Sequence, residues 1–108
     1  MNNIKIKLKT SELTGAALDW AVARCEVGDA INEIDDPHFY STDWAQGGPI
    51  IEQEKIELTH DGFEWWARIW ADEDYEGPTP LIAAMRCYVA CVLGDEVEVP
   101  EELKGVTA

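Results

Sequence analysis

The sequence predicts an α+β domain in which a small, mostly antiparallel sheet is covered by helices on both faces, as an α-β-α sandwich. Three observations lead to this prediction. Residues 80–93 are almost entirely apolar, residues 57–71 contain an Asp-Gly pair between two strand-like segments, and residues 2–9 alternate between apolar and lysine side chains. These patterns favour a helix, a hairpin and a strand. A length of 108 residues is typical of one domain, so we expect a single domain over 1–108.

The first strand is predicted over residues 2–9, because apolar and lysine side chains alternate there with the period of a strand. One face is expected to be buried, and the lysine face suits an edge position because lysines discourage edge-to-edge pairing. The apolar members are Ile4, Ile6 and Leu8, and the basic members are Lys5, Lys7 and Lys9. Thr10 or Ser11 is then expected to cap a helix that runs to about Val27 and ends at Gly28.

Residues 28–41 are predicted to form a loop, because they contain glycine, proline and several aspartates. Ser41-Thr42-Asp43 is expected to open a second helical segment. Gly47-Gly48-Pro49 should interrupt it, which predicts a short helical turn at 43–46 and a new helix with Pro49 near its first position.

A β-hairpin is predicted around Asp61-Gly62, with strands over 57–59 and 63–71. Phe63, Trp65, Ala67 and Ile69 share one face of the second strand, and Trp66, Arg68 and Trp70 share the other. Apolar groups on both faces indicate a sheet that is covered on both sides. Residues 72–77 are expected to form an acidic loop and residues 95–108 an acidic tail.

The last helix is predicted over 80–93, because Thr79 is a favourable N-cap, Pro80 suits the first helical position and Gly94 is a stop signal. Of its 14 residues 12 are apolar, so the helix needs cover on more than one side, and this predicts a homodimer. Arg86 is its only charge. We expect a carboxylate or carbonyls to hold Arg86, because unpaired burial is costly; the alternative is that it binds an anion or a partner.

The formal net charge of −14 comes from 22 acidic and 8 basic side chains. Such a surface repels nucleic-acid phosphates and anionic lipids, so we expect no direct nucleic-acid partner and no membrane partner. The longest apolar stretch is also shorter than the roughly 20 residues that span a bilayer. The three cysteines, Cys25, Cys87 and Cys91, lack C-x-x-C spacing, which fits a reducing compartment such as the cytoplasm.

Residues 40–48 are the candidate for a ligand or partner surface, because a glycine pair there adjoins polar and aromatic side chains. Glycines allow a ligand or a partner backbone to approach closely. The alternative is a structural role, as an N-cap followed by a helix break. With the arginine of the last helix, the candidate residues are Tyr40, Asp43, Trp44, Gln46, Gly47, Gly48 and Arg86.

The histidines and cysteines show no spacing typical of catalysis or metal binding. Neither His38 nor His60 belongs to an acid-histidine-nucleophile or metal-ligand pattern, and Cys87 and Cys91 lie four apart on an apolar helix. We therefore predict no catalytic residue, no metal and no cofactor, and we interpret both cysteines as small core residues.

Three segments together carry a family resemblance: SELTGAALDWAVARCE, YSTDWAQGGPIIE and GPTPLIAAMRCYVACVLGDEVEVPEEL. They resemble the NinX family of tailed-phage proteins, which occurs in the nin region of lambda-like genomes and in prophages. They are also similar to the more diverged phage α-β-α sandwich domain. The resemblance covers nearly the whole chain. It implies a phage or prophage origin and expression in the host cytoplasm, and it transfers no catalytic residue to this chain.

The expected function is that of a non-enzymatic phage accessory protein, which binds a host or phage protein through an acidic and aromatic surface. One alternative is a DNA mimic, whose carboxylates imitate phosphates and inhibit a host nucleic-acid-binding or defence complex. A second alternative is a small enzyme with its pocket at the glycine-rich 40–49 segment. Salt separates the first two, because the affinity of a mimic should fall steeply with ionic strength.

Overall fold

The computed structural model describes residues 4–33, 38–69 and 73–103 of the chain. In these ranges the fold is α+β and every strand pairing is antiparallel, as predicted. The elements, in chain order, are β1 (Lys5–Lys9), η1 (Thr10–Glu12), α1 (Gly15–Val27), η2 (Gly28–Glu33), α2 (Trp44–Glu54), β2 (Glu57–His60), β3 (Trp65–Arg68), β4 (Tyr75–Gly77), α3 (Pro80–Leu93), β5 (Glu96–Pro100) and η3 (Glu101–Leu103).

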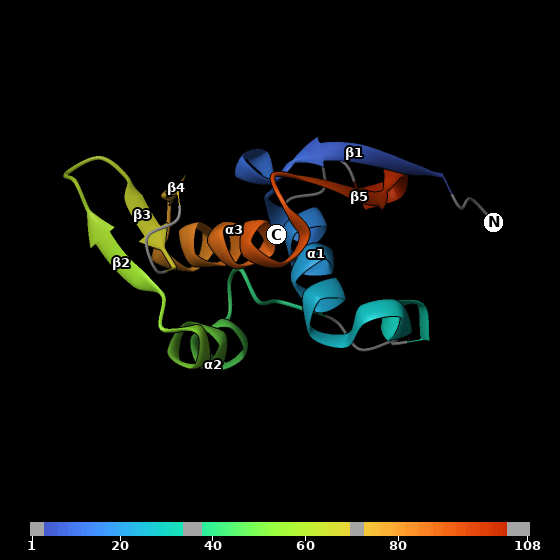
Figure 1. Ribbon diagram of the computed structural model, residues 1–108, viewed down its shortest axis with the longest axis horizontal. Coiled ribbons are helices and arrows are strands. Elements are labelled where there is room, and N and C mark those ends of the chain that lie inside the picture. The colour runs from blue at the N-terminus through green and yellow to red at the C-terminus, as the bar shows by residue number, and fades with distance from the viewer. Residues whose placement is uncertain (1–3, 34–37, 70–72, 104–108) are drawn as a thin grey trace.

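The strands are divided between two sheets rather than gathered in one. β1 pairs with β5, while β2, β3 and β4 form a three-stranded sheet in that order. Helix α3 runs through the middle of an elongated molecule of 43 × 23 × 22 Å, and it packs against β3, β4, α1 and α2 (Figure 1). α3 is therefore the element that joins the three-stranded sheet to the rest of the chain.

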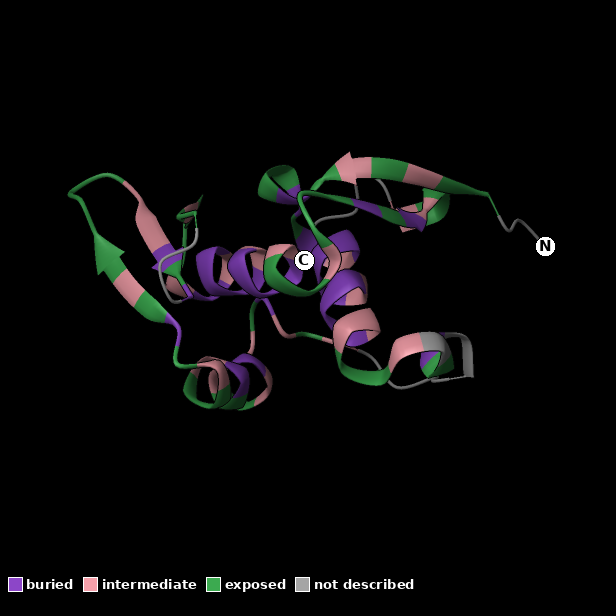
Figure 2. Cartoon of the chain, in the orientation of Figure 1, coloured by how far each residue is buried: buried purple, intermediate pink, exposed green. Residues whose placement is uncertain are grey.

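Helix α3 begins and ends where the sequence predicts. The Thr79 hydroxyl accepts a hydrogen bond from the Ile82 N–H at 3.1 Å, and Gly94 ends the helix with a positive φ of 98°. Much of the helix is buried (Figure 2), and its exposed apolar part is the C-terminal turn, where Val92 is 50% exposed. The chain itself thus covers most of α3, and the homodimer stays a prediction. In the described residues, no helix is long and apolar enough to cross a membrane.

The first helix starts later than predicted, at Gly15, and Thr10 is not its cap. Thr10 is fully buried; its N–H donates to Asp95 O at 2.9 Å and its hydroxyl donates to Gly94 O at 2.7 Å. The side chain therefore ties the end of β1 to the end of α3. Strand β1 has the predicted alternation from Lys5 to Lys9, since Lys5 and Lys7 are exposed while Ile6 and Leu8 are partly buried. Ile4, which was expected on the buried face, precedes the strand and is 56% exposed.

Three segments expected to be irregular contain regular structure. Residues 28–33 form the 3-10 helix η2, while residues 34–37 of the predicted loop lie outside the described residues. The acidic loop contains β4, and the acidic tail contains β5. Val97 and Val99 of β5 are buried between exposed glutamates, so the segment has the period of a half-buried strand despite its charge.

The hairpin turns at Asp61-Gly62 as predicted, but β3 is shorter than expected and Phe63 belongs to the turn, where it is 91% exposed. The Asp61 carboxylate accepts hydrogen bonds from the N–H groups of Phe63 and Glu64 and from Trp66 Nε1, each at 2.8 Å. These donors lower the pKa of Asp61 to about 2, because they stabilise its ionised form. The turn is thus fixed by one carboxylate.

Cysteine placement differs from the prediction at one position. Cys87 is buried, as expected for a small core residue, but Cys91 is exposed. The helix passes beyond the three-stranded sheet in its last turn, so a residue one turn later on the same side loses its cover.

Candidate functional site

The candidate surface predicted at residues 40–48 comprises the start of helix α2 and the residues just before it. Together with the two preceding residues, we call this stretch the 38–48 segment. The predicted helix break at Gly47-Gly48-Pro49 is wrong, because α2 is continuous from Trp44 to Glu54 with Pro49 inside it. Gly47 has a packing role: a Cβ there would lie 2.4 Å from Tyr40 O and 2.6 Å from Leu81 Cδ2. The space beside this glycine is therefore filled by the protein itself and is closed to a ligand.

Hydrogen bonds within the 38–48 segment fix its backbone. The Phe39 carbonyl accepts from the N–H groups of Thr42 and Asp43, at 3.1 and 2.7 Å, and the Phe39 N–H donates to Gln46 Oε1 at 2.9 Å. The Asp43 carboxylate accepts from the Ala45 N–H at 2.9 Å and caps α2. Asp43 and Gln46, which the sequence singled out as candidate contact residues, thus hold the segment together.

The segment is also anchored to the core through α1. The Ser41 N–H donates to Asp19 Oδ1 at 2.8 Å, and both residues are buried. Burial raises the pKa of Asp19, and the neighbouring Ser41 and His38 oppose that shift. The Ser41 hydroxyl lies near this carboxylate but has no partner with hydrogen-bonding geometry among the described residues. Sequence reasoning passed over Asp19, although it is the one charge within residues 15–23.

Two large aromatic side chains project from this fixed backbone. Phe39 is 45% exposed and Trp44 is 53% exposed. Tyr40 is half-buried and its ring stacks on that of His38, with centroids 5.9 Å apart and an interplanar angle of 13°. Burial, followed by the charges of Glu26 and Asp19, raises the pKa of Tyr40 and keeps its hydroxyl neutral. The segment is therefore an exposed aromatic surface on a rigid support.

Arg86 does not belong to this surface. Its Nε donates to Leu13 O at 2.7 Å and its Nη1 donates to Glu76 O at 2.8 Å, so carbonyls hold it, which is one of the two arrangements expected from the sequence. Burial lowers the pKa of the guanidinium, and the carboxylates of Glu76, Glu64 and Glu12 oppose that shift. Arg86 is thus held between β4 and Leu13, which precedes α1.

The two glycines should respond oppositely to alanine. We expect Gly47→Ala to lower the free energy of unfolding by about 1–3 kcal/mol, because the new Cβ overlaps a backbone carbonyl and Leu81. Gly48→Ala should be neutral or raise it by up to about 1 kcal/mol, since a Cβ there meets only Trp44 Cε3 at 3.7 Å and alanine favours the helix. Urea denaturation followed by tryptophan fluorescence measures both; equal effects would contradict the packing role of Gly47.

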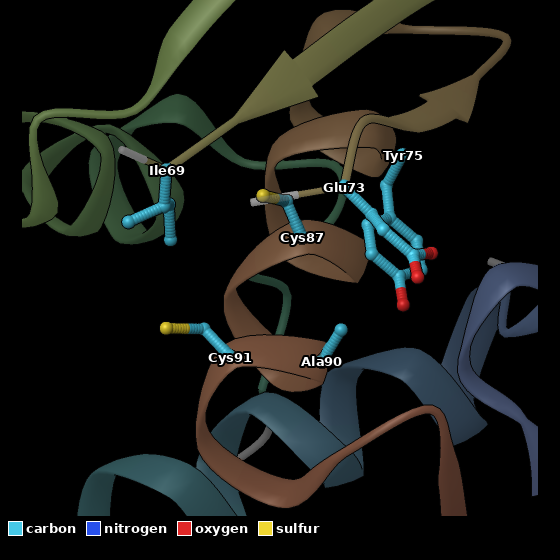
Figure 3. Close-up of a pocket in the computed structure, with 6 residues that line it drawn as sticks. All are labelled: Ile69, Glu73, Tyr75, Cys87, Ala90 and Cys91. Carbon is cyan, nitrogen blue, oxygen red and sulfur yellow. The ribbon is translucent and has the colours of Figure 1, made fainter. Parts of the chain in front are cut away.

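A small open pocket lies elsewhere, between α3 and the strands (Figure 3). Its volume is about 280 Å³, and its lining residues are Ile69, Glu73, Tyr75, Cys87, Ala90 and Cys91. In Figure 3 the two cysteine side chains point to the same side of α3, while Glu73 and Tyr75 lie together on the other side.

In the part of the chain that the structure describes, no group of three or more histidine, cysteine or acidic side chains is arranged to hold a metal ion. Burial raises the pKa of Cys25 to about 12, which disfavours the thiolate that a nucleophile requires.

The comparisons with known proteins identify a family. The family model described as "Bacteriophage P22, NinX" matches residues 9–91, which include α1, the 38–48 segment, the three-stranded sheet and most of α3. A comparison with curated proteins gives no match. The match extends over most of the chain and includes the first two of the segments that carry the resemblance. The chain therefore belongs to the NinX family of phage P22.

Proposed function

We propose that this protein is a non-enzymatic accessory protein of a phage or prophage, and that it binds a host or phage protein through the 38–48 segment. Membership of the NinX family supports the phage context. The observation that carries the binding role is the exposure of Phe39 and Trp44, at 45% and 53%, on a backbone fixed by hydrogen bonds. Exposed aromatic side chains are frequent anchors of protein–protein interfaces.

The fixed backbone matters because binding is weakened by the entropy that is lost when a loop becomes ordered. Here the bonds to Gln46 and Asp19 already hold the segment in one conformation. A partner would therefore find Phe39 and Trp44 at fixed positions. The formal net charge of −14 favours a protein over a nucleic acid as this partner. The host cytoplasm is the compartment we propose for the encounter.

Alanine variants test this role. We expect Trp44→Ala and Phe39→Ala each to weaken partner capture by about 30-fold or more, because interface anchors contribute at least about 2 kcal/mol. The measurement is quantitative affinity capture from lysate of infected host cells, followed by titration of the captured protein against each variant. Phe63→Ala is the matched control, because Phe63 is 91% exposed but lies on the hairpin turn. Loss of capture by Phe63→Ala with normal capture by Trp44→Ala would place the contact surface on the hairpin.

DNA mimicry is the second candidate, and one observation favours it. The two acidic runs of the sequence meet: Glu73, Asp74 and Glu76 line the same cavity, of about 630 Å³, as Asp95 and Glu96. A row of carboxylates from two elements is what imitation of a phosphate backbone requires. Under this alternative, capture of the partner should decrease steeply as ionic strength rises. Capture through Phe39 and Trp44 should change little with ionic strength.

A further inference from the structure

The three-stranded sheet has one covered face and one open face. Ala67 and Ile69 are buried on the side where α3 packs. Trp66 and Arg68 alternate with them and so point to the opposite side. Trp66 is half-buried and Arg68 is exposed. Among the described elements, the helix packed extensively on this sheet is α3, which leaves the Trp66 side open.

The open face continues into a groove. Strand register places Glu76 opposite Trp66, and a cavity of about 630 Å³ extends from these residues to the start of β5. Figure 1 shows β4 and the start of β5 along the same side of α3. We call this cavity the β4–β5 groove; its lining residues are Lys9, Ser11, Trp66, Glu73, Asp74, Tyr75, Glu76, Asp95 and Glu96.

The groove is strongly negative. Nine of the described residues line it; five of these are acidic, and Lys9 alone among them is basic. Asp74 is neutralised by Arg68, whose Nε and Nη2 lie 2.5 and 3.0 Å from its two carboxylate oxygens. The remaining carboxylates make no ion pair within 4.0 Å in the described residues. They are Glu73, Glu76, Asp95 and Glu96.

The geometry points to a polycationic occupant. In the described residues, no group of three or more acidic side chains is arranged to hold a metal ion. Carboxylates spread along a groove match several separate charges on an extended chain better than one compact ion. The aromatic face of Trp66, beside Glu76, suits a planar guanidinium, which stacks on indole and pairs with carboxylates.

We propose that the β4–β5 groove binds an arginine-rich segment of a partner protein, with one guanidinium stacked on Trp66 and others paired with the carboxylates of Glu73, Glu76, Asp95 and Glu96. The proposal rests on the proposed function in one respect only, that the partner is a protein. The groove does not include Phe39 or Trp44, so the two surfaces are tested separately.

The test is a titration of the full-length, isotope-labelled protein with an oligo-arginine peptide, followed by NMR at physiological salt. We expect the largest shifts at the Trp66 indole N–H and at the amides of 73–77 and 95–96. An oligo-lysine peptide should bind more weakly, because an ammonium neither stacks as well nor pairs with two oxygens. Shifts spread evenly over all acidic residues, or centred elsewhere, would overturn the proposal.

A pair of charge-matched variants separates the groove from the overall charge. Glu73→Gln, Glu76→Gln, Asp95→Asn and Glu96→Gln together should weaken peptide binding by at least about tenfold. The control neutralises four exposed glutamates outside the groove, Glu52, Glu98, Glu101 and Glu102, and should weaken binding by less than about threefold. Equal losses would mean non-specific attraction and would refute the proposal. The Trp44→Ala variant should bind the peptide normally. Peptide binding in the groove would therefore be unchanged if the capture experiments showed that the 38–48 segment does not contact a partner.

Discussion

Replacing Ile69 by alanine should lower the free energy of unfolding by about 2–5 kcal/mol. Ile69 is 2% exposed and belongs to the core cluster that includes Met85 and Val89 of α3. Because α3 joins the three-stranded sheet to the rest of the chain, a cavity at this contact weakens the attachment of the whole sheet. Chemical denaturation measures the change. If the free energy of unfolding depends on denaturant concentration with the same slope as in the parent protein, the variant still unfolds as one unit.

Lysines of β1 are the controls for this prediction. Lys7→Ala should change stability little, because Lys7 is exposed. Lys5→Ala should cost somewhat more, since Lys5 Nζ lies 5.6 Å from the centroid of the Trp20 ring, within range of a cation–π contact. If either lysine variant were less stable than Ile69→Ala, the assignment of buried and exposed residues in these strands would be wrong.

Elements whose ends are determined by local chemistry are the ones that the sequence predicts well. The cap at Thr79, proline at the first position and the stop at Gly94 define α3 from residues within one turn of its ends. The Asp-Gly turn is local in the same sense, since Asp61 bonds to N–H groups only two and three residues away. These signals act through neighbours in sequence, so no knowledge of the fold is needed to interpret them.

Elements that depend on distant contacts are predicted less well. A glycine pair and a proline favour a break in α2, but Gly47 is needed for close contact with Tyr40 and Leu81, and the helix continues. In β5 the high acid content obscures an alternation of period two. That strand pairs with β1, and the register places Lys7 opposite Glu98 and Lys9 opposite Glu96, so the strand depends on a pairing with residues far away in sequence.

The sequence identifies some residues of the candidate surface and not others. The 38–48 segment contains Trp44, a residue that the sequence identifies and that the structure leaves exposed. Phe39 was missed, because exposure cannot be read from one aromatic residue in a polar stretch. Asp19 could have been found by the argument applied to Arg86, since a lone charge in an apolar helical segment requires a buried partner. Its partner, Ser41, is 22 residues away, beyond the range of periodicity.

Arg86 is the second position at which a large effect is expected. Its guanidinium donates to two carbonyls on different elements, Leu13 before α1 and Glu76 in β4. Arg86→Ala leaves both carbonyls without this donor and removes a half-buried stem that packs between the elements. We expect a loss of about 2–4 kcal/mol in the free energy of unfolding, measured by urea denaturation. The free energy of unfolding of Arg86→Lys should lie between those of the parent protein and Arg86→Ala, since one ammonium does not reproduce the planar arrangement of donors.

Arg68→Ala is the matched control, because it removes the same side chain from an exposed pair with Asp74 and should have a smaller effect. The comparison also decides between the two roles considered for Arg86. A structural arginine lowers stability when it is removed, and partner capture is then lost only in proportion to the unfolded fraction. If Arg86→Ala were as stable as the parent protein yet failed to capture the partner, Arg86 would be a contact residue, and its bonds to Leu13 and Glu76 would serve to position it for binding.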